Sequence, residues 1–191
     1  MVKCYRGFTM TYAVVAPTKS TIFTKLRTFI QSIINCEVIQ GLGNLAAMPI
    51  GGFIVITPLF MDRLSTNYNT FHDGSYDLPT PTPGIQQSQQ SVQYTIQIDC
   101  YGTSSNEWAN AITTLWRDDY GCQALLPDCQ PLYADNPKQI ALIDGEQNYT
   151  QRWAITAVMQ YNPVTTVPMD FFDSTIFDMI DVDSDTTYDL Q

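Results

Sequence analysis

The sequence has few basic residues: nine Lys and Arg among 191, spread along the chain without a run, and one histidine. Proteins that bind duplex DNA or RNA neutralise phosphates with clustered Lys and Arg. The sequence therefore argues against specific nucleic-acid binding. His72 stands beside Asp73 without the nucleophile motif or ligand spacing that catalysis or metal binding requires. We expect it to be a surface residue.

Long apolar runs are also missing. No stretch approaches the roughly 18–20 apolar residues that cross a bilayer. Lys3 and Arg6 precede the short apolar stretch 13–16, which polar residues flank too closely for a signal peptide. We expect neither a membrane partner nor secretion.

Cysteine is present in an odd number, and its spacing matches no known framework. None of Cys4, Cys36, Cys100, Cys122 and Cys129 forms a CxxC pair or lies near ligand-spaced histidines. Free thiols are expected, with Cys100 filling the core as a small apolar side chain. A disulfide between Cys122 and Cys129 is the alternative.

Two segments resemble ligand sites without meeting their requirements. The run 41–46 reads GLGNLA, a loose form of the glycine fingerprint that holds dinucleotides. That fingerprint needs a helix to begin inside it, whereas Pro49, Gly51 and Gly52 follow within a few residues. We expect a loop, and nucleotide binding at 41–52 is the rival interpretation.

The second such segment is a group of aspartates near the end of the chain. Its spacing and its lack of glycine do not fit a calcium-binding EF-hand loop, so solvation or pairing with a basic patch on another chain is favoured. The sequence thus assigns no catalytic residue, metal site or cofactor. The aspartates concerned are Asp178, Asp181, Asp183 and Asp185.

Acidity is concentrated at one end. The net charge is −10, and residues 164–191 hold seven Asp and no base, which leaves −3 for residues 1–163. Apolar residues make up 45% and aromatic residues 12%, enough to build one core. We predict an N-terminal extension over 1–17, a folded domain over 18–163 and an acidic, apolar arm over 164–191.

Apolar spacing predicts one helix over residues 18–35. Apolar residues recur there every three or four positions, as on the buried stripe of a helix. Thr18 or Ser20 is expected to cap its first turn. The stripe consists of Ile22, Leu26, Phe29, Ile30, Ile33 and Ile34.

Two strands and a long hairpin are predicted next. The apolar run 53–56 is typical of a central strand, which Pro58 then bends or brings to an edge. Residues 91–101 alternate apolar and polar side chains, the pattern of a half-buried strand. The polar segment 64–90 between them is expected to form a long, exposed hairpin or loop. Its tip holds prolines in alternation with threonine, at Pro79, Pro81 and Pro83.

A second helix and a second hairpin complete the domain. Ser104 and Glu107 form a capping-box pattern, and Gly121 is expected to end the helix. Segments 139–144 and 149–161 flank Asp144-Gly145, a strong hairpin dipeptide. The helix presents one apolar face and the last strand another: Trp108, Ala111, Ile112, Leu115 and Trp116; Trp153, Ile155, Ala157, Met159 and Tyr161.

This order of elements contains no βαβ repetition. It predicts an α+β fold, with a mainly antiparallel sheet, two amphipathic helices packed on one face, a long hairpin and an extended C-terminal arm. The arm carries large apolar side chains that solvent would not favour. We expect Phe171, Phe172 and Phe177 to anchor it, on an adjacent subunit rather than on its own core.

Several blocks in consistent order make the chain similar to the phage neck (tail) terminator family of tailed bacteriophages. The resemblance extends from the first helix to about residue 180. The blocks are Gln97-Ile98-Asp99-Cys100-Tyr101-Gly102, Pro131-Leu132-Tyr133-Ala134-Asp135, Gln151-Arg152-Trp153 and Gln160-Tyr161-Asn162-Pro163.

The resemblance implies a structural virion protein and brings no catalytic residues with it. Such a protein forms a ring, usually six-fold, that caps the tail tube, stops its polymerisation and joins the tail to the head connector. Contact with the tail sheath is implied for contractile tails. The protein would act at the virion neck after assembly in the host cytoplasm. A head-completion or tail-tube protein is the alternative, and contact of residues 76–90 with the neck or tube is a further expectation.

Overall fold

The main body of the protein is a six-stranded sheet with helices on one face. The computed structural model describes residues 12–43, 49–74, 84–143 and 149–169. The strand order is β2-β3-β6-β11-β7, with β8 also pairing with β11, and all pairs are antiparallel except β2 with β3. The strands are β2 (Glu37–Gln40), β3 (Phe53–Arg63), β6 (Val92–Tyr101), β7 (Gln130–Ala134), β8 (Lys138–Gln139) and β11 (Arg152–Tyr161).

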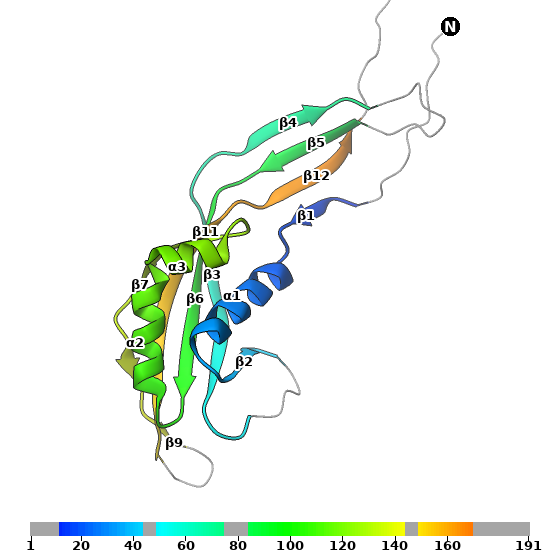
Figure 1. Ribbon diagram of the computed structural model, residues 1–191. Helices are drawn as coiled ribbons and strands as arrows, with labels where there is room; N and C mark the ends of the chain where they lie inside the picture. Colours follow the sequence, from blue (N-terminus) through cyan, green and yellow to red (C-terminus); the bar gives the residue numbers. More distant parts are fainter. Residues whose placement is uncertain (1–11, 44–48, 75–83, 144–148, 170–191) are drawn as a thin grey trace, which may run out of the picture.

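Three helices cover one face of this sheet, as Figure 1 shows: α1 (Lys19–Ile33), α2 (Ser105–Trp116) and α3 (Asp119–Leu125). One apolar cluster joins them to β3, β6 and β11. The predicted α+β architecture with a mainly antiparallel sheet is confirmed, and the short helix α3 adds to the two helices expected.

Helix α1 forms where its spacing predicts. Ile22, Leu26, Phe29 and Ile30 are almost fully buried, because their three- and four-residue spacing places them on one stripe. Thr18 is the N-cap, and its Oγ1 accepts a hydrogen bond from the Thr21 amide at 3.3 Å.

Pro58 interrupts the long strand β3 as expected. Residues 53–56 lie between β2 and β6, so this half of β3 is central. The pairing with β6 then shifts register between Pro58 and Phe60, because proline lacks the amide hydrogen that the ladder needs. Beyond the shift, β3 has no partner on its β2 side among the described residues.

The alternating strands place their apolar side chains on the helix side. Ile96, Ile98 and Cys100 of β6 join the core, and so do Ile155 and Met159 of β11. Trp116 is fully buried and donates its indole hydrogen to the Val158 carbonyl at 3.2 Å. Trp108, expected in the core, is only partly buried and packs beside the core cluster.

Two local predictions around α2 are wrong. Ser104 precedes the helix but makes no side-chain capping bond, because its backbone (φ −95°, ψ 14°) is not extended as a capping residue's usually is. Gly121 lies inside α3 rather than ending α2. A Cβ atom there would come within 2.3 Å of the Leu115 carbonyl oxygen, so glycine permits the close approach of α3 to the end of α2.

A second, four-stranded sheet projects from the main body (Figure 1). We call it the outer sheet, and its strand order is β1-β12-β5-β4, all antiparallel. Its strands are β1 (Val14–Ala16), β4 (Tyr68–His72), β5 (Gly84–Gln89) and β12 (Val164–Met169). The predicted hairpin over 64–90 is therefore real, but its arms are paired strands of a sheet.

The segments at both ends of the predicted domain contribute to the outer sheet. β1 lies within the expected N-terminal extension, and β12 is the first part of the expected arm. A short pair, β9 (Leu142–Ile143) with β10 (Tyr149–Thr150), flanks the predicted Asp144-Gly145 turn, which itself lies outside the described residues.

Candidate assembly surfaces

The outer sheet is a continuation of the strands of the main sheet. Only residues 90–91 separate β5 from β6, and only residues 162–163 separate β11 from β12. Two backbone hydrogen bonds brace the junction, from the Leu64 amide to the Ser91 carbonyl at 3.0 Å and from the Gln90 amide to the Pro163 carbonyl at 3.1 Å. The two sheets are thus connected by several strands rather than by one hinge.

The outer sheet has little core of its own. Among its described residues only Gly84 is buried, and no contact with a helix is large enough to cover either face. A sheet normally buries one face against another layer. The outer sheet therefore offers apolar surface for contact with other chains.

One apolar surface follows the side of the molecule formed by β3 and β4. Its members are 45–67% exposed, although they are large apolar or aromatic side chains. They lie on β3 from its register shift onward, on the connection that follows β3, and on the edge strand β4. This β3–β4 patch comprises Leu59, Phe60, Met61, Leu64, Tyr68 and Phe71.

A second apolar surface lies at the opposite edge of the outer sheet, on β1, on β12 and on Tyr12 just before β1. Its members are 36–80% exposed. Because β1 and β4 are the two outermost strands of the outer sheet, this surface and the β4 part of the first one lie at opposite edges of that sheet. This β1–β12 patch comprises Tyr12, Val14, Val15, Val167 and Met169.

The sequence-predicted contact residues all lie outside the described residues: Phe171, Phe172 and Phe177 of the arm, and Pro79, Pro81 and Pro83 of the hairpin. The structure does show where the chain enters those segments. Met169, the last residue of β12, pairs with Gly84, the first residue of β5. The proline segment and the arm therefore start from the same end of the outer sheet, the end away from the main body.

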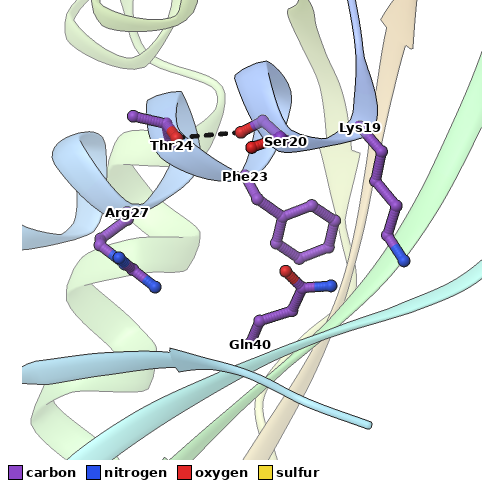
Figure 2. A pocket seen from close by; sticks show the side chains of 6 residues that line it. All are labelled: Lys19, Ser20, Phe23, Thr24, Arg27 and Gln40. Carbon is purple, nitrogen blue, oxygen red and sulfur yellow. Dashed lines mark hydrogen bonds between the residues drawn. The ribbon is translucent and has the colours of Figure 1, made fainter. Parts of the chain in front are cut away.

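The exposed side of α1 carries a shallow groove (Figure 2). The groove encloses about 270 Å³ and is lined by Lys19, Ser20, Phe23, Thr24, Arg27 and Gln40. Another depression of about 310 Å³ lies where the two sheets join, lined by Pro17, Gln89, Leu126, Pro127, Asp128, Cys129, Gln130, Gln160, Tyr161 and Asn162. Neither holds a nucleophile with a paired base.

The expected surface histidine is confirmed. His72 is exposed at the end of β4, where its Nε2 lies 3.2 Å from the Gln87 side-chain oxygen. Within the described ranges, no three His, Cys, Asp or Glu side chains gather as a metal site would require. The aspartates at 178, 181, 183 and 185 lie outside those ranges.

The cysteines in the described part of the chain are free, and the alternative Cys122–Cys129 disulfide is absent. Cys100 is fully buried, as expected for core filler. Burial raises the pKa of both Cys100 and Cys129 to about 12. A thiol that stays protonated is a poor nucleophile, so neither cysteine is suited to catalysis.

The glycine-rich segment also differs from a nucleotide site where it is described. Gly41 follows β2, donates its amide to the Ile56 carbonyl at 2.8 Å and packs against Thr57 of β3. A Cβ atom at Gly41 would overlap Thr57 Oγ1, so its glycine serves strand packing. Residues 44–48 of the segment lie outside the described residues.

None of the helices in the described portion of the chain combines the length and apolarity needed to cross a bilayer. A family model described as phage neck terminator protein matches residues 20–183. No match to a curated protein was found. Since the family model covers most of the chain, the chain belongs to the phage neck terminator family, a family of structural proteins of the phage tail and virion.

Proposed function

We propose that this neck terminator protein forms a closed ring of identical copies, six in number, on the end of the tail tube and joins the tail to the head connector. The family match over residues 20–183 is the observation that carries the proposal. The ring would cap the tube against further polymerisation and contact the tail sheath if the tail is contractile. The protein would fold in the host cytoplasm and act in the assembled neck.

The two apolar patches support a ring. In a ring built by rotation, each copy meets its neighbours through two different surfaces, one on each side. The β3–β4 patch and the β1–β12 patch are two such surfaces, and the strands β4 and β1 that carry part of each are the opposite edges of the outer sheet. We assign them to the contacts between neighbouring copies, which would bury side chains that a single copy leaves in water.

The far end of the outer sheet supports a separate contact with the neck or tube. The segment with Pro79, Pro81 and Pro83 and the arm with Phe171, Phe172 and Phe177 both begin there. Proline fixes its backbone torsion and stiffens an extended segment. We assign the proline segment to the partner above or below the ring, and the arm phenylalanines to an adjacent copy.

A phage lacking this protein tests the proposal. Tails and DNA-filled heads should accumulate unjoined, with tubes of irregular length in electron micrographs. Purified protein added to the mutant extract should restore joining after incubation with the tails. Normal particles in the absence of the protein would refute the proposal.

The same extract separates the second candidate, a head-completion protein. A head-completion protein would restore joining after incubation with the heads and would bind to heads sedimented without tails. A terminator should instead sediment with the tails alone. The order of addition thus decides between two structural roles in the same virion.

A further inference from the structure

Helix α1 is basic on its exposed side. It carries Lys19, Lys25 and Arg27 and no acidic residue, so it holds three of the nine basic residues of a chain whose net charge is −10. Lys19 and Arg27 are exposed. This concentration of positive charge is unusual for so acidic a protein and is placed beside a groove.

The groove places this charge around one largely buried aromatic side chain, Phe23. Figure 2 shows Phe23 between Lys19 and Arg27, with Gln40 reaching toward it from the end of β2. The Lys19 ammonium lies 5.6 Å from the centre of the Phe23 ring. A groove with several positive charges suits a segment rich in carboxylates.

The positive charges of the groove have no acidic partner in the described structure. The ion pairs found there join Lys25 to Asp128, Lys138 to Asp135 and Arg152 to Asp99. Lys19 and Arg27 take part in none of them. An anionic segment could therefore bind at the groove without breaking an existing ion pair.

We propose that the groove on α1 receives the acidic arm, residues 170–191, of a neighbouring copy; this rests on the proposed ring. The arm holds seven Asp and no base, and it carries Phe171, Phe172 and Phe177. It therefore complements the groove in charge.

The course of β12 favours a neighbour over the same copy. β1 pairs antiparallel with β12, and Ala16, close before α1, pairs with Val164 at the start of β12. β12 then runs to Met169, away from α1 and toward the free end of the outer sheet. The C-terminal end of β12 thus points away from the groove of its own copy. Its 22 residues can extend up to about 70 Å, enough to reach an adjacent copy.

Cross-linking of the assembled full chain tests the proposal directly. Rings are formed on tail tubes from equal amounts of ¹⁴N- and ¹⁵N-labelled protein and treated with a carbodiimide, which joins a lysine to a carboxylate only in direct contact. We expect mass spectrometry to find Lys19 joined to aspartates of the arm, with about half of these peptides pairing a heavy with a light chain, as random mixing of copies in a ring requires.

Two outcomes would overturn the inference while leaving the proposed function in place. One is an intact ring without any link between Lys19 and the arm. The other is an intact ring in which every such link joins peptides of the same isotope, which would place the arm on its own copy. Failure to form a ring on the tubes would instead contradict the proposed function itself.

A charge-reversal pair provides the second test. K19E/R27E should release rings from tubes at least tenfold faster than the natural protein and leave the melting temperature unchanged. The matched control R117E/K138E makes the same change in net charge at exposed sites away from the groove and from both apolar patches. Reversing two arm aspartates as D173K/D178K should rescue K19E/R27E. Equal losses in the two double variants, or no rescue, would refute the pairing.

Discussion

Arg152 of β11 holds the carboxylate of Asp99 on β6 from two nitrogens, with Nε and Nη2 each 3.0 Å from Oδ1. Gln97 donates to both oxygens of the same carboxylate, at 3.0 and 2.9 Å. Asp99 is only 3% exposed, although it lies on the sheet face opposite the core cluster. The group therefore ties together the two central antiparallel strands of the main sheet.

Removing the arginine should leave the buried Asp99 carboxylate without its cationic partner. We expect Arg152→Met to lower the free energy of unfolding by about 2–4 kcal/mol, since breaking a buried pair leaves an uncompensated charge. Urea denaturation measures the change. Asp99→Asn in the same background should recover part of the loss. Lys138→Met, which removes the exposed pair with Asp135 at 3.9 Å, is the control and should cost less than about 1 kcal/mol. Equal costs for the two single variants would contradict this account.

The buried thiols should resist alkylation across the ordinary pH range. Burial raises the pKa of Cys100 and Cys129 to about 12, so at pH 8 only about one molecule in 10⁴ carries each thiolate. Reaction with iodoacetamide followed by mass spectrometry should leave both unlabelled at pH 7–9 in the folded protein and label both in urea. Rapid labelling of Cys100 in the folded protein at pH 8 would disprove its placement in the core.

The apolar patches should matter for assembly and not for folding. Phe60→Asp in the β3–β4 patch and Val15→Asp in the β1–β12 patch replace exposed side chains, so each should change the free energy of unfolding by less than about 1 kcal/mol. Each should abolish the ring on tubes. Leu132→Asp, at an exposed position of β7 outside both patches, is the control and should assemble normally.

Mixing the two patch variants tests the head-to-tail arrangement. Val15→Asp copies keep an intact β3–β4 patch, and Phe60→Asp copies keep an intact β1–β12 patch. One good contact per pair is then possible, so the mixture should form heterodimers that cannot close into a ring. Analytical ultracentrifugation distinguishes these species. A complete ring from the mixture would show that the two patches do not face each other.

The proline segment should act in joining rather than in stability. Replacing Pro79, Pro81 and Pro83 with Gly or Ser leaves β4 and β5 paired, so we expect the melting temperature to stay within a few degrees. Head-to-tail joining in extract should fall several-fold, because a stiff contact segment becomes flexible. A large drop in melting temperature would place the segment in the fold instead.

The periodic spacing of apolar residues predicted the elements that bury a single face. In α1, β6 and β11 the apolar residues keep one spacing along the whole element, helical in α1 and alternating in the two strands. Their apolar residues join the core cluster as that spacing requires. The bend at Pro58 was also predictable, because it depends on one missing donor. The burial of Cys100 was predictable from its place among the alternating apolar residues of β6.

The outer sheet was only partly predictable. β5 reads GIQQSQ and β12 reads VTTVPM, sequences with little apolar alternation, since neither strand covers a core within its own chain. Their pairing depends on partners far along the chain, which local spacing does not encode. The basic groove was missed for a similar reason, because Gln40 approaches Lys19 and Arg27 only after β2 has packed beside β3.

Local signals failed around α2 where packing overrode them. The Ser104 and Glu107 pattern is typical of a capping box, but Gly102 adopts φ +109° and turns the chain tightly into the helix. Gly121 looked like a helix end because glycine often is one. In the structure, the close contact between α3 and the Leu115 carbonyl explains why residue 121 is a glycine.

Cryo-electron microscopy of the neck in assembled particles tests the central proposal most directly. We predict a closed ring of copies between the tail tube and the head connector, with the β3–β4 patch of each copy against the β1–β12 patch of the next. A particle in which this chain is absent from the junction, or in which its copies do not touch one another there, would contradict the account.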